Sequence, residues 1–143
     1  MKLFKIILEG PLEYDPAFNK VVDNIEDEGG KYLGSGDYGS VYLHNGRAVK
    51  VTTDEIELEH AEILKGIKTN NFVHIYDVER LEDKLGIITM EVMGKYKGEV
   101  PDDFIDALER EAENLNIDPE ELDIRPDNFM IHPKSGKLKM TDV

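Results

Sequence analysis

Two stretches of the chain carry residues whose types and spacing could bind phosphate and metal. The first is Gly34-Ser35-Gly36-Asp37-Tyr38-Gly39, which Val41 and Lys50 follow. Glycines lack a Cβ, so their backbone N–H groups can approach phosphate oxygens closely. A lysine on a nearby strand could offer an ammonium group to the same phosphates. The alternative is a glycine-bearing hairpin with a surface lysine.

The second stretch runs from Leu122 to Asp142. It contains Asp123, Arg125, Asp127 and Asn128, and after a turn at 133–136 it ends on Asp142. Carboxylate and amide oxygens are the ligands that Mg²⁺ prefers, and a carboxylate can also accept a proton. The alternative is structural, because aspartates cap turns and asparagine is a common turn residue.

Local patterns place the first stretch between strands. Tyr32-Leu33, residues 41–43 and residues 48–51 are rich in strand formers, and Asn45-Gly46 is a strong hairpin signal. A dinucleotide-binding loop would instead open into a helix. The glycines are therefore predicted to join two antiparallel strands, with Lys50 on a third.

The remaining elements follow from periodicity and turn residues. We expect strands over 1–8, 72–78 and 85–90, with a polar turn at 82–84. Helices are predicted over 16–28, over 54–68 and from Pro101 onward. On the second helix the expected apolar face is Ile56, His60, Ile63 and Ile67, with His60 on the buried side. On the third helix the expected apolar stripe is Phe104, Leu108, Ala112 and Leu115, and the expected solvent-facing residues are Glu109, Arg110, Glu111 and Glu113.

The order strand, glycine loop, strand, hairpin and Ala48-Val49-Lys50 resembles the nucleotide-binding lobe of protein kinases. The stretch from Asp123 to Ile131 resembles their catalytic loop, and Leu138 to Asp142 their metal-binding strand. The resemblance covers residues 31–143. It implies an α+β fold with a five-stranded antiparallel nucleotide lobe and one main helix, then a reduced helical part with a small hairpin. The implied division is an extension over 1–30, a nucleotide lobe over 31–94 and a truncated second lobe over 95–143.

The resemblance also implies roles for single residues. Asp123 would be the catalytic base, with Lys50 and Arg125 neutralising phosphate charge, and Asn128 and Asp142 would bind Mg²⁺. Met90 would lie behind the adenine of ATP, and Glu91 and Met93 would contribute backbone groups. The implied nucleotide contacts are Gly34, Ser35, Gly36, Gly39, Val41, Ala48, Lys50, Met90, Glu91 and Met93.

Protein kinases pair the strand lysine with a glutamate from the following helix. Counting back from Leu64 places that position on His60, which Glu59 and Glu62 flank. We predict Glu59 as the partner of Lys50, with Glu62 second. The alternative is that both glutamates lie on a solvated helix face.

The sequence departs from the kinase pattern near the second stretch. Glu121-Leu122 stands where many kinases have His-Arg, and the chain ends one residue after Asp142, without an activation loop. The chain is either naturally minimal or a piece of a longer protein. We predict a serine/threonine-kinase-like phosphotransferase of minimal size that uses ATP and Mg²⁺ on protein hydroxyls or on itself. A pseudokinase-type module that binds nucleotide or a partner protein, and a decoy that binds no nucleotide, are the alternatives.

Composition narrows the partners. The chain has 143 residues, a formal net charge of −14 and no cysteine. Such an acidic protein is a poor general ligand for nucleic acid or anionic membranes, so we expect neither as a partner. No stretch approaches the ~20 apolar residues of a membrane span. Without cysteines a reducing compartment is compatible, and we expect a cytoplasmic protein.

Overall fold

The computed structural model describes residues 16–35, 38–81 and 85–142. The strand expected over 1–8, Gly36 of the glycine loop and the turn expected at 82–84 lie outside these residues. Among the described residues, no helix has the length and apolar character needed to cross a membrane.

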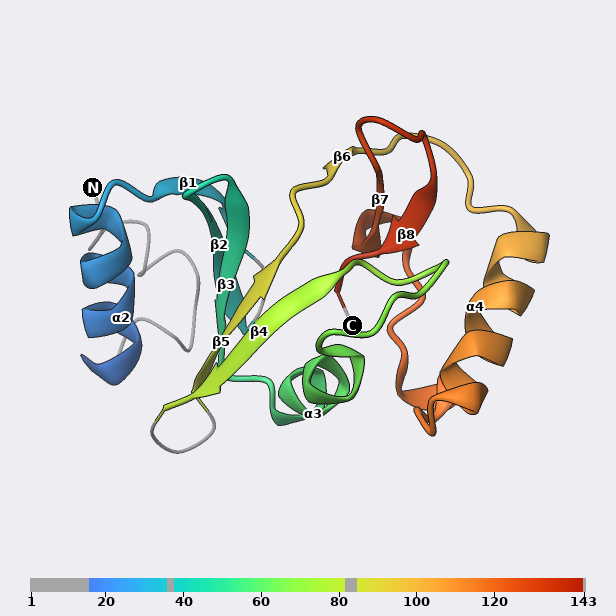
Figure 1. The fold of residues 1–143 in the computed structure, drawn as a ribbon, viewed down its shortest axis with the longest axis horizontal. Helices are drawn as coiled ribbons and strands as arrows, with labels where there is room; N and C mark the ends of the chain where they lie inside the picture. The colour runs from blue at the N-terminus through green and yellow to red at the C-terminus, as the bar shows by residue number, and fades with distance from the viewer. Residues whose placement is uncertain (1–15, 36–37, 82–84, 143) are drawn as a thin grey trace.

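Five antiparallel strands form the first sheet (Figure 1). They are β1 (Lys31–Ser35), β2 (Gly39–His44), β3 (Arg47–Thr52), β4 (Ile75–Arg80) and β5 (Gly86–Met90), in the order β1-β2-β3-β5-β4. The predicted hairpin is confirmed, because Asn45 and Gly46 join β2 to β3 with φ angles of 53° and 76°. The five-stranded antiparallel sheet of the predicted α+β fold is confirmed as well.

Helix α2 (Pro16–Asp27) packs against one face of this sheet (Figure 1). Its buried side chains share a small core with residues of β2 and β3, namely Phe18, Val22 and Ile25 with Tyr42, Val49 and Val51. Because side chains alternate along a strand, Ala48 and Lys50 point to the opposite face. Helix α2 therefore braces the outer face of the sheet, and the inner face remains for the cavity.

Helix α3 (Glu55–Leu64) lies against the other face and is shorter than predicted. The expected apolar face is wrong, since Ile56, Ile63 and Ile67 are exposed while Leu58, Ala61 and Leu64 are buried. Both sets of residues repeat at helical spacing, so periodicity alone does not show which set is buried. The packing of α3 against the sheet determines it. A Cβ on Gly86 of β5 would collide with Leu58, so the missing side chain of Gly86 makes room for that leucine. The burial of His60 is confirmed.

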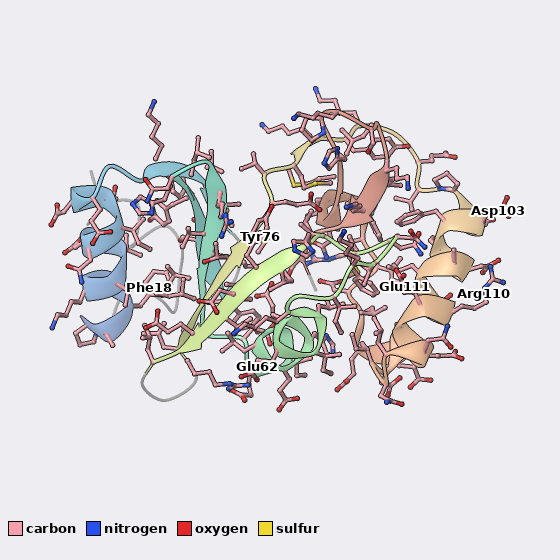
Figure 2. The ribbon with its side chains drawn as sticks, in the orientation of Figure 1. Phe18, Glu62, Tyr76, Asp103, Arg110 and Glu111 are labelled. Atoms are coloured by element: carbon pink, nitrogen blue, oxygen red, sulfur yellow. The ribbon has the colours of Figure 1, made fainter. Side chains whose placement is uncertain are left out.

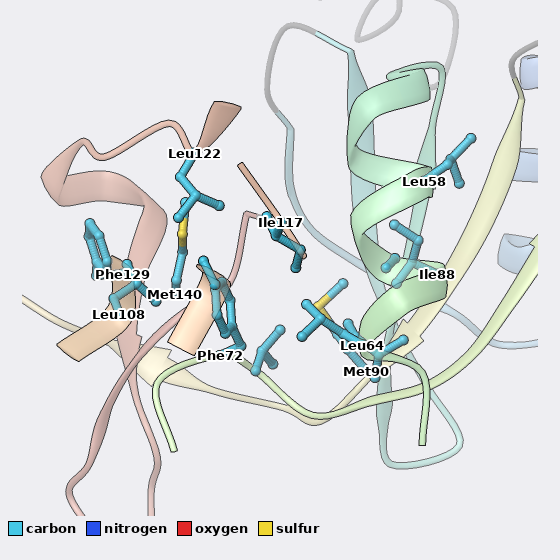
Figure 3. Packing of buried hydrophobic residues seen from close by; sticks show 14 of the residues in the cluster. Leu58, Leu64, Phe72, Ile88, Met90, Leu108, Ile117, Leu122, Phe129 and Met140 are labelled. Carbon is cyan, nitrogen blue, oxygen red and sulfur yellow. The ribbon is translucent and has the colours of Figure 1, made fainter. Parts of the chain in front are cut away.

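The C-terminal part contains a helix and a second, three-stranded sheet in the order β6-β7-β8. Its elements are β6 (Gly94–Lys95), α4 (Asp102–Asn114), the 3-10 turns η2 (Pro119–Glu121) and η3 (Pro126–Asn128), β7 (Phe129–Ile131) and β8 (Leu138–Met140). The predicted hairpin is present as β7 and β8, whereas β6 was not predicted. Figure 3 shows that one hydrophobic core joins this part to α3 and the first sheet, through residues such as Leu58, Ile88, Leu108 and Phe129.

Helix α4 buries Leu108 and Ala112 as predicted, and Phe104 packs edge to face on Phe129 at 5.6 Å between ring centroids. One expected solvent-facing residue is different. Glu111 lies on the side of α4 that faces the body of the protein (Figure 2). Its carboxylate accepts backbone N–H bonds from Asn70 and Asn71 at 3.0 and 2.9 Å. These hydrogen bonds hold Glu111 against the segment before β4, so this contact overrides the polar-face prediction.

Candidate functional site

A cavity of about 580 Å³ lies between the first sheet and the β7–β8 hairpin. Most of the sequence-predicted site residues line it: Gly34, Ser35, Gly39, Val41, Ala48, Lys50, Met90, Glu91, Met93, Asp123, Arg125, Asn128 and Asp142. Gly36 lies outside the described residues, and Glu59 does not line the cavity. Residues from the first sheet and from the C-terminal part therefore line the same cavity.

Lys50 connects the two halves of this cavity. Its ammonium contacts the Glu57 carboxylate of α3 at 2.5 Å and the Asp142 carboxylate, which follows β8, at 3.2 Å. β3 presents Lys50 opposite Val41 of β2 and Ile88 of β5, so two neighbouring strands hold its backbone. The side chains of Lys50 and Glu57 are nearly buried, at 13% and 3% exposure, whereas Asp142 is 40% exposed.

The prediction of Glu59 as the partner of Lys50 is wrong, because the partner is Glu57 and Glu59 is exposed. Glu62, the second choice, bonds to Arg80 on the surface. The start of α3 explains the shift. Asp54 caps the helix by accepting from the N–H groups of Ile56 and Glu57, which fixes Glu57 on the first turn.

The sequence contained a signal for this position. Asp54 and Glu57 have the spacing of a capping box, in which the glutamate would bond back to the N–H of the cap residue. Here Thr52 Oγ1 accepts that N–H at 3.1 Å instead. The Glu57 carboxylate is therefore available to Lys50.

Two carboxylates share one ammonium at this point, and this sets their protonation. Burial raises the pKa of Glu57 to about 7; Lys50 counteracts the rise and Asp142 adds to it. Burial also acts to raise the pKa of Asp142, but the Lys50 charge and hydrogen bonds hold it below the usual range. Burial opposes the charge on Lys50, yet the two acids raise its pKa. Lys50 and Asp142 are thus charged at neutral pH, and Glu57 titrates there.

The loop around η3 holds the second group of predicted residues. Asn128 is buried and donates its side-chain amide to the Asp123 backbone carbonyl at 2.7 Å. The Asn128 carbonyl in turn accepts from Thr141 N–H at 2.9 Å, so the loop is tied to the end of β8. The Asp123 and Arg125 side chains form an exposed ion pair at 2.6 Å. The Asp123 carboxylate at the cavity is therefore already paired with the Arg125 guanidinium.

The cavity is also lined by Met90, Glu91 and Met93, where β5 leaves the sheet. Met90 of β5 is buried, and it pairs with Ala48 on the neighbouring strand β3. The Glu91 N–H donates to the His74 carbonyl at 3.1 Å, so this donor is already used. Sequence reasoning did not identify Met130 and Thr141, which line the cavity as well. Met130 closely follows Asn128 on β7, and that spacing could have indicated it.

The chemistry of Asn128 and Asp142 fits a magnesium ion. Because the side-chain nitrogen of Asn128 is bonded to Asp123, the side-chain oxygen Oδ1 of Asn128 can serve as a metal ligand. Asp142 offers a carboxylate. Within the described ranges, no group of three or more His, Cys, Asp or Glu side chains could hold a metal ion. An ion here would take its other ligands from phosphate and water, as Mg²⁺ in nucleotide sites does.

Comparison with known proteins gives the fold a name. No protein-family model matches the chain, and no curated protein does. The PknI kinase domain of Mycobacterium tuberculosis matches with a TM-score of 0.54 and 16% identity, over 78% of this chain and 57% of that one. Rad53 in complex with AMP-PNP matches with a TM-score of 0.58 and 17% identity, over 90% and 42%. The chain thus spans about half the length of these kinase chains. Its architecture is a protein kinase-like fold.

Proposed function

We propose that the cavity binds Mg²⁺ and ATP and that the protein transfers the terminal phosphoryl group to a hydroxyl. One observation carries this proposal: Lys50 meets Asp142 at 3.2 Å within a cavity that the glycine-bearing strands also line. Phosphoryl transfer needs positioned positive charge and oxygen ligands more than covalent help. A buried lysine, an asparagine and an aspartate around one cavity are the parts that this chemistry uses.

Each residue has a distinct role in the proposal. Lys50 orients the phosphates, and Asn128 and Asp142 would hold Mg²⁺, which would supply positive charge to the phosphate oxygens. The acceptor oxygen forms a bond to the terminal phosphorus, and the bond from that phosphorus to the bridging oxygen breaks. The proton of the acceptor hydroxyl passes to the Asp123 carboxylate. Arg125 moves from Asp123 to the transferring phosphoryl group.

The experiment is transfer of labelled phosphate from ATP to a panel of protein and small-molecule hydroxyls. Wild type is expected to label at least one acceptor or itself. Asp123→Ala and Asp142→Ala are expected to lose the signal, while Asp127→Ala, in the same loop and also lining the cavity, keeps it. Labelling that survives in both of the first two variants would point to another site or a contaminant.

A second candidate is a pseudokinase-type module that binds nucleotide without useful transfer. The Asp123–Arg125 ion pair favours it, because the proposed base and the proposed phosphate ligand neutralise each other in the free protein. Thermal denaturation with Mg²⁺ and ATP separates the cases. Both candidates require a higher midpoint, because a ligand stabilises the state that binds it. A raised midpoint without phosphate labelling supports the pseudokinase-type module. An unchanged midpoint contradicts both candidates and supports a decoy that binds no nucleotide.

A further inference from the structure

The second sheet carries a surface whose charge is opposite to that of the rest of the protein. We propose that this surface binds an acidic, carboxylate-rich polypeptide segment of a partner protein. We define the lysine face as Lys95 and Lys97, on and just after β6, with Lys134 and Lys137, in the turn between β7 and β8. All four side chains are exposed. The proposal is independent of the nucleotide site.

The distribution of charge is the first argument. Residues 94–97 and 129–140 contain five lysines and no acidic residue. The rest of the chain keeps 12 of the 17 basic residues and all 31 acidic ones, a net charge of −19. Taken together, the rest of the chain therefore has more than two acidic residues for each basic one. Carboxylates are plentiful in the chain, yet none lies in the segments that build this surface.

Among the described residues, these four lysines have no ion-pair partner. Several cations elsewhere do have partners: Lys65 pairs with Asp77 at 3.0 Å, and Arg80 with Glu55 and Glu62 at 2.6 and 2.7 Å. Lys139, the fifth lysine of the sheet, is held by Glu91 at 2.8 Å. In the part of the chain that the structure describes, no carboxylate lies within ion-pair distance of any lysine of the face. A partner would have to supply the carboxylates.

The width of the second sheet suits an extended peptide. Lys95 lies beside Met130 of β7, and Met130 lies beside Lys139 of β8. Neighbouring strands are ~4.8 Å apart, so the three-stranded sheet is ~10 Å wide, and one extended segment can span it. The turn from 132 to 137 closes on itself, with Lys134 and Ser135 N–H groups bonded to His132 Nδ1. In Figure 2, side chains that end in nitrogen project from the tip of this hairpin.

The chemistry favours a peptide over a nucleic acid. A long polyanion would extend beyond the face onto a surface that carries the −19 charge, and repulsion there would oppose binding. A short acidic segment can stay within the face, because screening confines its contacts to about 8–10 Å at physiological salt. The face also has no arginine, the residue best suited to fork-like phosphate contacts.

The test uses fluorescence anisotropy with a labelled peptide of alternating glutamate and serine. Wild type is expected to bind it, and affinity is expected to fall as salt rises. The triple variant Lys95→Gln, Lys134→Gln, Lys137→Gln is expected to bind roughly tenfold more weakly, from several exposed charge contacts. The matched control replaces three exposed lysines outside the sheet: Lys20→Gln, Lys31→Gln and Lys68→Gln. It is expected to bind like wild type.

Several results would overturn the proposal. They are no binding to wild type, equal losses in the two triple variants, and tighter binding of duplex DNA or of anionic vesicles than of the acidic peptide. Changes in backbone NMR chemical shifts on addition of the peptide provide a second test. Shifts confined to residues 94–97 and 132–139 support the proposal, and shifts centred on the cavity contradict it. Loss of phosphate transfer in Asp123→Ala leaves these readings unaffected, so the two proposals can fail separately.

Discussion

Replacing Glu57 by glutamine separates two accounts of the buried cluster around Lys50. In one account the Lys50–Glu57 ion pair stabilises the fold, so the variant should lose stability wherever Glu57 is charged. In the other, one ammonium is shared by two carboxylates, and the charged form of the buried Glu57 is costly. The second account follows from the pKa of about 7 that burial and Asp142 give Glu57, against its ordinary value of 4.5.

The magnitude follows from linkage between protonation and folding. Because the pKa of Glu57 is higher in the folded state, the native protein binds more protons than the unfolded chain between pH 4.5 and about 7. The stability from this group is complete below pH 4.5 and is lost as the pH rises through about 7. The loss is of order 3 kcal/mol in the free energy of unfolding. Lys50 and Asp142 keep their charges in this range, since their pKa values are shifted away from it.

The assay is urea denaturation of wild type and Glu57→Gln from pH 5 to pH 8.5. Glutamine resembles the neutral carboxylic acid, so the two proteins should differ by about 1 kcal/mol or less at pH 5. As the pH rises, the variant should become more stable than wild type. Glu59→Gln, an exposed change on the same helix, should track wild type at every pH. If wild type instead gains on Glu57→Gln with rising pH, the ion pair dominates and the reasoning about shared charge is wrong.

Three further predictions concern the scaffold of the cavity. Gly39→Ala should lower the free energy of unfolding by about 1–3 kcal/mol in urea, because the new Cβ would lie 2.5 Å from the Val51 carbonyl oxygen; an unchanged midpoint would contradict the close approach. Burial acts to raise the pKa of Glu91, but the hydrogen bond from Lys139 and other contacts lower it below 4.5. The contribution of Glu91 to the free energy of unfolding is therefore present above pH 4.5 and is lost as the pH falls below that value. Thermal scans should therefore show wild type losing its advantage over Glu91→Gln as the pH falls, and a constant difference would argue against that ion pair. Leu108→Ala should cost about 2–5 kcal/mol by urea denaturation, since Leu108 is fully buried in the shared core; a loss near zero would place that residue outside it.

Local sequence signals predicted the strands of the first sheet well, because short-range interactions determine them. Asn45-Gly46 adopts the left-handed angles that a tight hairpin needs, which no neighbouring contact has to enforce. Strand β6 was missed for the opposite reason. Gly94 and Lys95 have no strand pattern of their own, and only pairing with Ile131 and Met130 makes them a strand. Pairing across long sequence separation leaves no local signal.

Side-chain partners were predictable only where a motif specified them. The positions of Lys50 and Asp142 came from the kinase-like pattern, and the structure places the two side chains in contact. The choice of Glu57 over Glu59 depends on which face of α3 meets the sheet. That choice is made by the fit of Leu58 over Gly86, two residues far apart in sequence. A helix with two apolar stripes does not reveal from its sequence which one is buried.

The contacts that position Asp142 extend well beyond the cavity. Met140 exchanges backbone hydrogen bonds with the segment before β4, donating to the Asn71 carbonyl at 2.8 Å and accepting from Val73 N–H at 2.9 Å. The Glu111 carboxylate of α4 in turn accepts the Asn71 N–H. A surface helix is thus connected through one backbone segment to the strand that delivers Asp142 to Lys50. The C-terminal part therefore both supplies residues to the cavity and fixes their distance from the first sheet, so that α4 belongs to the scaffold of the site although it lines none of it.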